Sequence, residues 1–109
     1  MAIDQPWKPA RATEETRKLA RDEKLQITYS VHARQRLIER DLTTGDALYV
    51  LKHGFVYEDP ECASREGLYK YRVESRSPNS GSRTLRVVVI PDPSSLWIKV
   101  VTIMFLDET

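Results

Sequence analysis

Residues 68–106 read LYKYRVESRSPNSGSRTLRVVVIPDPSSLWIKVVTIMFL, and this stretch decides the fold. It holds three runs rich in β-branched and aromatic residues, at 68–75, 83–90 and 96–106, a composition typical of β-strands. Between them lie two short segments dominated by Pro, Ser, Asn, Gly and Asp, residues that favour turns. Three strands joined by short turns predict an antiparallel meander.

Two helices are predicted before this meander. Ser30 is the expected N-cap of a helix over 31–40, and Thr43 or Thr44 is the expected N-cap of a second helix that stops at Gly54. In the helix over 31–40, the side chains expected to face the core are those of Val31, Ala33, Leu37 and Ile38.

The N-terminal part of the chain gives weaker signals. Residues 1–12 predict a loose arm with Trp7 as an anchor. Residues 13–24 predict a helix capped by Thr13, because acidic residues follow the cap, and its thin apolar face places it on the surface. Residues 25–29 alternate apolar and polar side chains, which predicts a short strand.

Together these elements predict an α+β fold, with two or three N-terminal helices packed on an antiparallel sheet of about four strands. The length of 109 residues suits one core. We divide the chain into an N-terminal arm and surface helix at 1–24 and an α+β domain at 25–109. The segment 1–24 has three open roles: packing on its own domain, bridging to a second copy in a homodimer, or docking a protein partner.

Composition excludes several classes of protein. No apolar run approaches the roughly 18 residues that a membrane helix needs, and no signal peptide is expected, so we expect a cytoplasmic protein. The single cysteine, Cys62, excludes an internal disulfide and a cysteine-based zinc site. The net charge is +1, but residues 62–106 carry seven basic and three acidic residues. A polyanion would therefore bind this half of the chain.

Three basic side chains recur at helical spacing in the stretch 31–40. His32, Arg36 and Arg40 lie at i, i+4 and i+8, so they share one helix face. An imidazole beside a guanidinium can deprotonate a hydroxyl and hold a phosphate. In the structural alternative, His32 caps or packs the helix and Arg36 pairs with an acid such as Glu39. No cluster of residues with metal-ligand spacing accompanies the two histidines, and we expect no metal and no cofactor.

The strands carry a second set of basic residues. Strand periodicity places Lys70 and Arg72 on one face and Tyr71 on the other, and it places Arg86 on the same face as Val88. Cations and aromatic rings on a sheet suit RNA, because cations hold phosphates and rings stack on unpaired bases. The alternative is an ordinary solvent-facing sheet surface with the tyrosines in the core.

The string YSVHARQRLIERDLTTGDALYVLKHG at 29–54 resembles the start of the domain family DUF4258. The resemblance extends to the strands at 71–73, 83–90 and 100–105, and covers about residues 27–106. The positions that carry the N-terminal motif are Tyr29, Ser30, His32, Ala33, Arg36, Leu37, Glu39, Arg40, Leu42, Thr43 and Gly54.

That family is similar to the RelE-like and MqsR-like toxins of bacterial type II toxin–antitoxin systems. The resemblance implies a RelE-like α+β fold, a metal-independent endoribonuclease acting on mRNA, and an antitoxin of the zinc-finger/helix-turn-helix MqsA or YgiT type. It implies His32 or Tyr71 as the base, with Arg36, Arg72 and Arg86 stabilising the transition state. The rival hypothesis is a protein- or RNA-binding module without catalysis. The residues expected to be catalytic are His32, Arg36, Tyr71 and Arg86, and those expected to bind RNA are Arg40, Lys70, Arg72 and Arg83.

Overall fold

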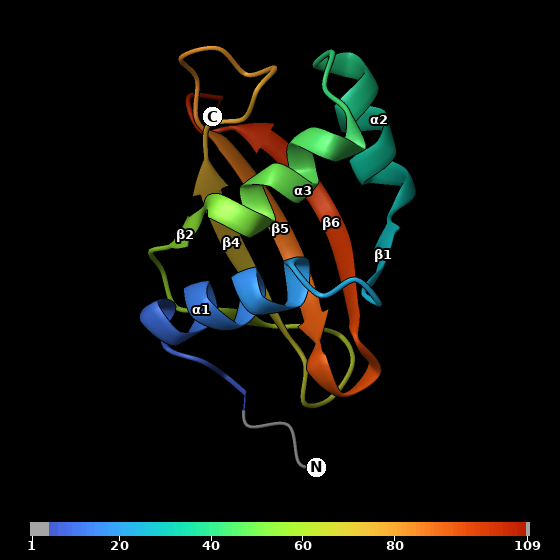
Figure 1. The fold of residues 1–109 in the computed structure, drawn as a ribbon, viewed down its shortest axis with the longest axis vertical. Helices are drawn as coiled ribbons and strands as arrows, with labels where there is room; N and C mark the ends of the chain where they lie inside the picture. Colours follow the sequence, from blue (N-terminus) through green and yellow to red (C-terminus); the bar gives the residue numbers. More distant parts are fainter. Residues whose placement is uncertain (1–4, 109) are drawn as a thin grey trace.

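The computed structural model describes residues 5–108, which form three α-helices and a mixed sheet of six strands (Figure 1). The predicted α+β class is confirmed. No helix among the described residues has the length and apolar character needed to cross a membrane. In chain order the elements are α1 (Pro9–Ala20), β1 (Gln26–Tyr29), α2 (Val31–Glu39), α3 (Thr44–His53), β2 (Phe55–Val56), β3 (Glu61–Cys62), β4 (Tyr69–Ser75), β5 (Leu85–Asp92), the 3-10 turn η1 (Pro93–Ser95) and β6 (Trp97–Phe105).

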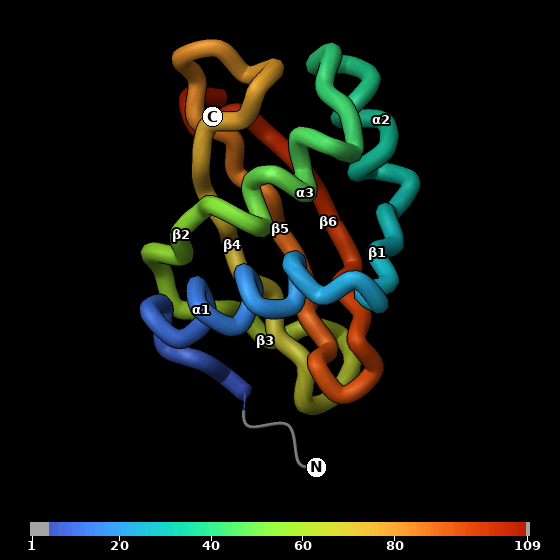
Figure 2. Tube along the Cα trace, in the orientation of Figure 1, coloured from blue at the N-terminus to red at the C-terminus, as the bar shows by residue number. Residues whose placement is uncertain are grey.

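The predicted meander forms the centre of the sheet. Strands β4, β5 and β6 are antiparallel neighbours, and the full order is β1-β6-β5-β4-β2, with β3 pairing the start of β4 (Figure 2). The sheet is mixed because β1 pairs in parallel with β6, whereas the sequence predicted antiparallel pairing throughout. It has more strands than the expected four because β2 and β3 are two-residue strands, too short to show a period of two in the sequence.

One face of the sheet packs against helices and the other does not. Helices α1 and α3 pack together on one face of the sheet, where α3 contacts β4 and β5 and α1 contacts β2, while α2 lies beside β6 and β1 at one side (Figure 1). Alternate strand residues point into the core under α1 and α3, which leaves the other face, hereafter the open face, with half-buried side chains. The buried hydrophobic side chains of β4, β5 and β6 in this core are Tyr71, Val73, Leu85, Val87, Val89, Ile98, Val100, Ile103 and Phe105.

Helix α1 differs from the sequence prediction in its start and in its burial. It begins at Pro9, four residues before the expected cap, because proline suits the first position of a helix. Thr13 lies inside the helix, where its hydroxyl donates to the Pro9 carbonyl at 3.0 Å and accepts from the Val56 N–H of β2 at 2.8 Å. The helix buries Ala12 and Leu19, so the expectation that it lies on the surface is wrong.

The predicted Trp7 anchor is confirmed. Trp7 is 3% exposed and stacks on Tyr71 of β4, with 5.4 Å between the ring centroids. The Tyr71 hydroxyl accepts from the Trp7 N–H at 3.0 Å and donates to the Gln5 Oε1 at 3.0 Å. The segment before α1 therefore seals one end of the core.

Helices α2 and α3 begin at the predicted caps. The Ser30 Oγ accepts from the Ala33 N–H at 2.9 Å, and Thr43 forms a capping box with Asp46. In α2, however, Val31 and Ile38 are 74% and 80% exposed, so their expected place in the core is wrong. Helix α2 contacts the sheet mainly through β6, and this narrow contact covers only its side chains Ala33 and Leu37.

Candidate anion-binding groove

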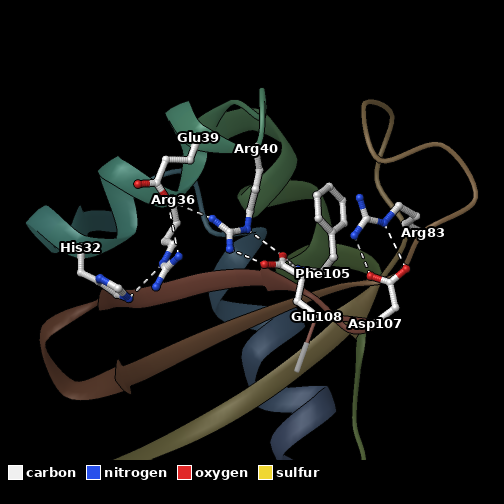
Figure 3. Close-up of polar contacts among 8 residues, drawn as sticks. All are labelled: His32, Arg36, Glu39, Arg40, Arg83, Phe105, Asp107 and Glu108. Carbon is white, nitrogen blue, oxygen red and sulfur yellow. Dashed lines mark hydrogen bonds and ion pairs between the residues drawn. The ribbon is translucent and has the colours of Figure 1, made fainter.

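Helix α2 presents three basic side chains in one line toward β6. His32, Arg36 and Arg40 share one face of the helix, as the spacing predicted, and this face points toward the strands (Figure 3). With residues of β6 and of the turn that follows it, they line a hollow of about 360 Å³. We call this hollow the α2 groove, and its lining residues are His32, Arg36, Arg40, Thr102, Met104 and Glu108.

A second hollow continues the α2 groove toward the β4–β5 loop. Arg40 and Glu108 line both hollows, and Arg83 and Phe105 line only the second. The Arg83 guanidinium lies over the Phe105 ring, 3.6 Å from its centroid, which is a cation–π contact. Arg83 therefore lies at one end of a basic path that begins at His32 (Figure 3).

His32 and Arg36 are in direct contact. The Arg36 Nε donates to the His32 Nε2 at 3.3 Å, so in this geometry Nε2 is the acceptor nitrogen of the imidazole. The His32 side chain is exposed, so a substrate hydroxyl can reach the ring. An imidazole that accepts a proton beside a guanidinium provides a base and an anion contact in one place. Arg36 also pairs with Glu39 at 3.4 Å, the ion pair of the structural alternative.

The other two arginines of the path, Arg40 and Arg83, each bind a carboxylate of the turn after β6. Glu108 binds the Arg40 guanidinium with both oxygens, one of them at 2.7 Å from Nε. Hydrogen bonds from Arg40 lower the pKa of Glu108 to about 2, and the pKa of Arg40 is raised by the same hydrogen bonds. Asp107 binds the Arg83 NH2 at 2.6 Å, and this hydrogen bond lowers the pKa of Asp107. Two consecutive acids thus neutralise two cations of the path.

The predicted strand arginines form a separate cluster on the open face. Arg86 contacts Glu74 at 2.9 Å and Glu58 at 3.6 Å, and Arg72 contacts Glu61 at 3.0 Å. The Cα of Arg86 pairs with that of Met104 in the α2 groove, but its guanidinium binds these acids instead. The structure thus groups His32, Arg36 and Arg40, and keeps Arg72 and Arg86 apart from them.

Lys70 and Tyr71 lie on opposite faces, as the strand period predicted. Lys70 is half-buried on the open face. Tyr71 is fully buried, and its hydroxyl already binds Trp7 and Gln5. The structure does not bring Tyr71 together with His32, and this placement does not favour a role for Tyr71 as a base.

The groove includes residues that sequence reasoning missed. Strict alternation from the buried Ile98 and Val100 would place Thr102 and Met104 in the core. They point outward because β6 shifts its register opposite Val88 and Val89, which the sequence does not indicate. Glu108 gives no local signal either, because its partner Arg40 is 68 residues away.

Metal ligation and thiol chemistry have little support in residues 5–108. No group of three or more His, Cys, Asp or Glu residues there could hold a metal ion. The only cysteine, Cys62, is an exposed residue of β3.

Comparison with known proteins identifies one family. Residues 29–105 match the family described as "Domain of unknown function (DUF4258)". The match spans α2, which supplies the basic side chains, and β6, which supplies the floor of the groove, and it begins after α1. No curated protein and no solved structure matches the chain.

Proposed function

This chain belongs to the DUF4258 family, and from its α2 groove we propose that it is the toxin of a bacterial type II toxin–antitoxin system, a metal-independent endoribonuclease that cleaves mRNA in the cytoplasm. The observation that carries the proposal is the 3.3 Å contact between Arg36 Nε and His32 Nε2 in an open hollow beside Arg40. An imidazole base next to two guanidinium groups suits phosphodiester chemistry.

In the proposed reaction the RNA strand is cleaved by its own ribose. When an RNA phosphate accepts the Arg36 Nε–H in place of the imidazole, the lone pair of His32 Nε2 becomes available. His32 Nε2 then removes the proton from a 2′-OH, the 2′ oxygen forms a bond to the adjacent phosphorus, and the bond from phosphorus to the 5′ oxygen breaks. Water in the open groove protonates the leaving 5′ oxygen. The products are a 2′,3′-cyclic phosphate and a 5′-hydroxyl, and no metal takes part.

The arginines of the path would stabilise the negative charge. Arg36 and Arg40 line the α2 groove and would hold the phosphate whose charge increases in the transition state. Arg83 lines the adjoining hollow and would bind a neighbouring phosphate of the same strand. The cluster of Arg72 and Arg86, with Lys70 on the same open face, would contact RNA outside the cleavage site. Tyr71 has no step in this mechanism.

The proposed protein partner is an antitoxin, of the zinc-finger/helix-turn-helix MqsA or YgiT type. It would neutralise the toxin by covering the α2 groove, which is open on the surface. An antitoxin of this kind would present carboxylates to the groove, because Glu108 and Asp107 already bind two arginines of the path in that way.

One observation favours a second candidate, a binding module without catalysis. Arg36, Arg40 and Arg83 each bind a carboxylate of the same chain. Such pairs weaken contacts to RNA phosphates unless the RNA displaces the acids. In this second candidate the same groove binds RNA or a protein, and His32 has no chemical role.

A cleavage assay separates the two candidates. Purified protein is incubated with single-stranded RNA in a chelator, and the 3′ ends of the products are analysed for 2′,3′-cyclic phosphate. We expect cleavage by the wild type, loss of at least 100-fold in rate for His32→Ala, and no change for the control His53→Ala, whose exposed ring lies on α3. Intact RNA with the wild type would favour the binding module, and equal cleavage by both variants would exclude His32 as the base.

A further inference from the structure

Strand β1 has a free edge. Among the strands of residues 5–108 it lies at the end of the sheet and pairs only with β6. There the Gln26 N–H donates to the Leu96 carbonyl at 2.9 Å, and the Ser30 N–H donates to the Val100 carbonyl at 3.0 Å. Because alternate residues of a strand point to opposite sides, the backbone groups of Ile27 and Tyr29 point away from β6. Within residues 5–108, neither has a backbone hydrogen bond on that outer side.

The opposite edge of the sheet is covered. There the outer N–H of Val56 in β2 donates to the Thr13 hydroxyl of α1 at 2.8 Å, and α1 packs along this strand. An uncovered edge strand is a template for pairing with another strand, and proteins usually block it with charge, proline or a covering element. The four residues of β1 carry no charge and no proline.

The sequence around β1 is nearly symmetric. Residues 25–31 read LQITYSV, with apolar or aromatic side chains at the odd positions and polar ones at the even positions. If two copies pair antiparallel about Thr28, Ile27 lies opposite Tyr29 of the second copy, and Leu25 lies opposite Val31. Val31 begins α2 directly after β1 and is 74% exposed, without a cover of its own.

We propose that two copies of this chain associate by antiparallel pairing of their β1 edges into one continuous sheet. The outward backbone groups of Ile27 and Tyr29 then exchange four hydrogen bonds, two from each copy. Each exposed Val31 packs against the half-buried Leu25 of the second copy. The contact is isologous, with the same residues on both sides, as closed dimers require.

This arrangement would bring two α2 grooves to one side of the dimer. The two-fold axis of an antiparallel pair runs perpendicular to the sheet, so both open faces look the same way. The dimer does not depend on the proposed RNA cleavage, because it rests on β1, Leu25 and Val31, which do not line the α2 groove.

Amide hydrogen exchange at two protein concentrations tests the pairing directly. In the dilute protein, we expect the amides of Ile27 and Tyr29 to exchange fast and those of Gln26 and Ser30 to exchange slowly. On concentration, the exchange of Ile27 and Tyr29 should slow at least 10-fold as sedimentation shows dimer forming. Dimer formation without this protection, or a monomer at millimolar concentration, would overturn the proposal. If the amides of Ile27 and Tyr29 became protected only after a foreign peptide was added, the proposal would also be overturned.

A pair of matched variants provides the second test. Val31→Asp places a carboxylate next to Leu25 of the second copy and should weaken the dimer at least 10-fold. Ile38→Asp changes a side chain of equal exposure on the same side of α2, about 10 Å further along the helix axis. It should change the association constant less than twofold. Urea unfolding of both variants checks that the monomer fold is retained. Equal effects of the two variants would contradict the proposed register.

Discussion

Glu108 binds the guanidinium of Arg40 through both of its carboxylate oxygens, across 68 residues of sequence. Its Oε1 also accepts from the Phe105 N–H, at 2.6 Å, which fixes the turn after β6 over the groove. A carboxylate held in this way occupies the position in which Arg40 would bind a phosphate. The acidic end of the chain is therefore an internal competitor of any anion in the α2 groove.

Removing this competitor should strengthen RNA binding. Glu108→Gln removes the carboxylate that binds Arg40 through both oxygens and leaves the ion pair with Glu39 at 3.1 Å. We expect the affinity for single-stranded RNA at low salt to rise about 3- to 10-fold. The slope of log affinity against log salt should steepen by about 0.7 for one added phosphate contact. The matched control is Glu15→Gln, which removes an ion-pair partner of Arg11 on α1, at 3.6 Å, and should change the affinity less than twofold. An equal rise in both variants would show a general charge effect instead.

Two carboxylates should make the fold sensitive to acid. Burial opposes the ionisation of Asp46, but hydrogen bonds from the Thr43 backbone and Asn79 outweigh it and lower its pKa to about 2. Glu108 also has a pKa of about 2, because it binds Arg40. Groups with a lowered folded-state pKa stabilise the fold fully above their unfolded values, 3.8 and 4.5 here. Their contribution is lost as the pH falls from about 5 toward 2.

The variant Asp46→Asn separates the contribution of Asp46 to this acid sensitivity from that of Glu108. It should lower the free energy of unfolding at pH 7 by about 1–2 kcal/mol, because it removes the charged half of the capping box. Its free energy of unfolding should then fall less steeply than that of the wild type between pH 5 and pH 2, measured by urea unfolding. Parallel pH curves for the two proteins would contradict the low pKa of Asp46.

The local part of the fold could be predicted from sequence. The meander, the Ser30 and Thr43 caps and the Gly54 stop all depend on residues within a few positions of one another. The parallel pairing of β1 with β6 could not be predicted in this way, since Gln26 and Trp97 are paired across the whole length of the domain.

The exposure of Ile38 also depends on a contact between distant parts of the chain, which the sequence did not predict. A helical wheel predicts which side chains share a face, but not how wide a neighbouring surface is available to cover that face. Helix α2 meets the sheet mainly at β6, and Ala33 and Leu37 fill that contact.

The candidate site also has a part that sequence predicts and a part that it does not. Helical spacing predicted the row of His32, Arg36 and Arg40, because one helix provides all three. Glu108, which binds Arg40 with both carboxylate oxygens, comes from the other end of the domain, so nothing near Arg40 in sequence indicates this contact.

The end of α3 depends on a glycine for reasons of space. A Cβ at Gly54 would come within 2.6 Å of the Val50 carbonyl oxygen and 2.8 Å of the Glu74 carbonyl oxygen. Both are backbone atoms, which cannot move aside cheaply. Gly54→Ala should therefore lower the free energy of unfolding by about 1–3 kcal/mol. The control Gly45→Ala meets only the Thr43 hydroxyl, at 3.4 Å, and should change the stability by less than about 1 kcal/mol.

Tyr71→Phe separates stability from chemistry. The substitution keeps the ring that stacks on Trp7 but removes the hydroxyl, so the buried Trp7 N–H loses its acceptor. The free energy of unfolding should fall by about 1–2 kcal/mol. The rate of RNA cleavage per folded molecule should be unchanged, because Tyr71 lies on the face of the sheet opposite the α2 groove. The measurement compares urea unfolding with cleavage at a temperature where both proteins are folded. A rate loss comparable to that of His32→Ala, in a protein that is still folded, would restore Tyr71 as a candidate base.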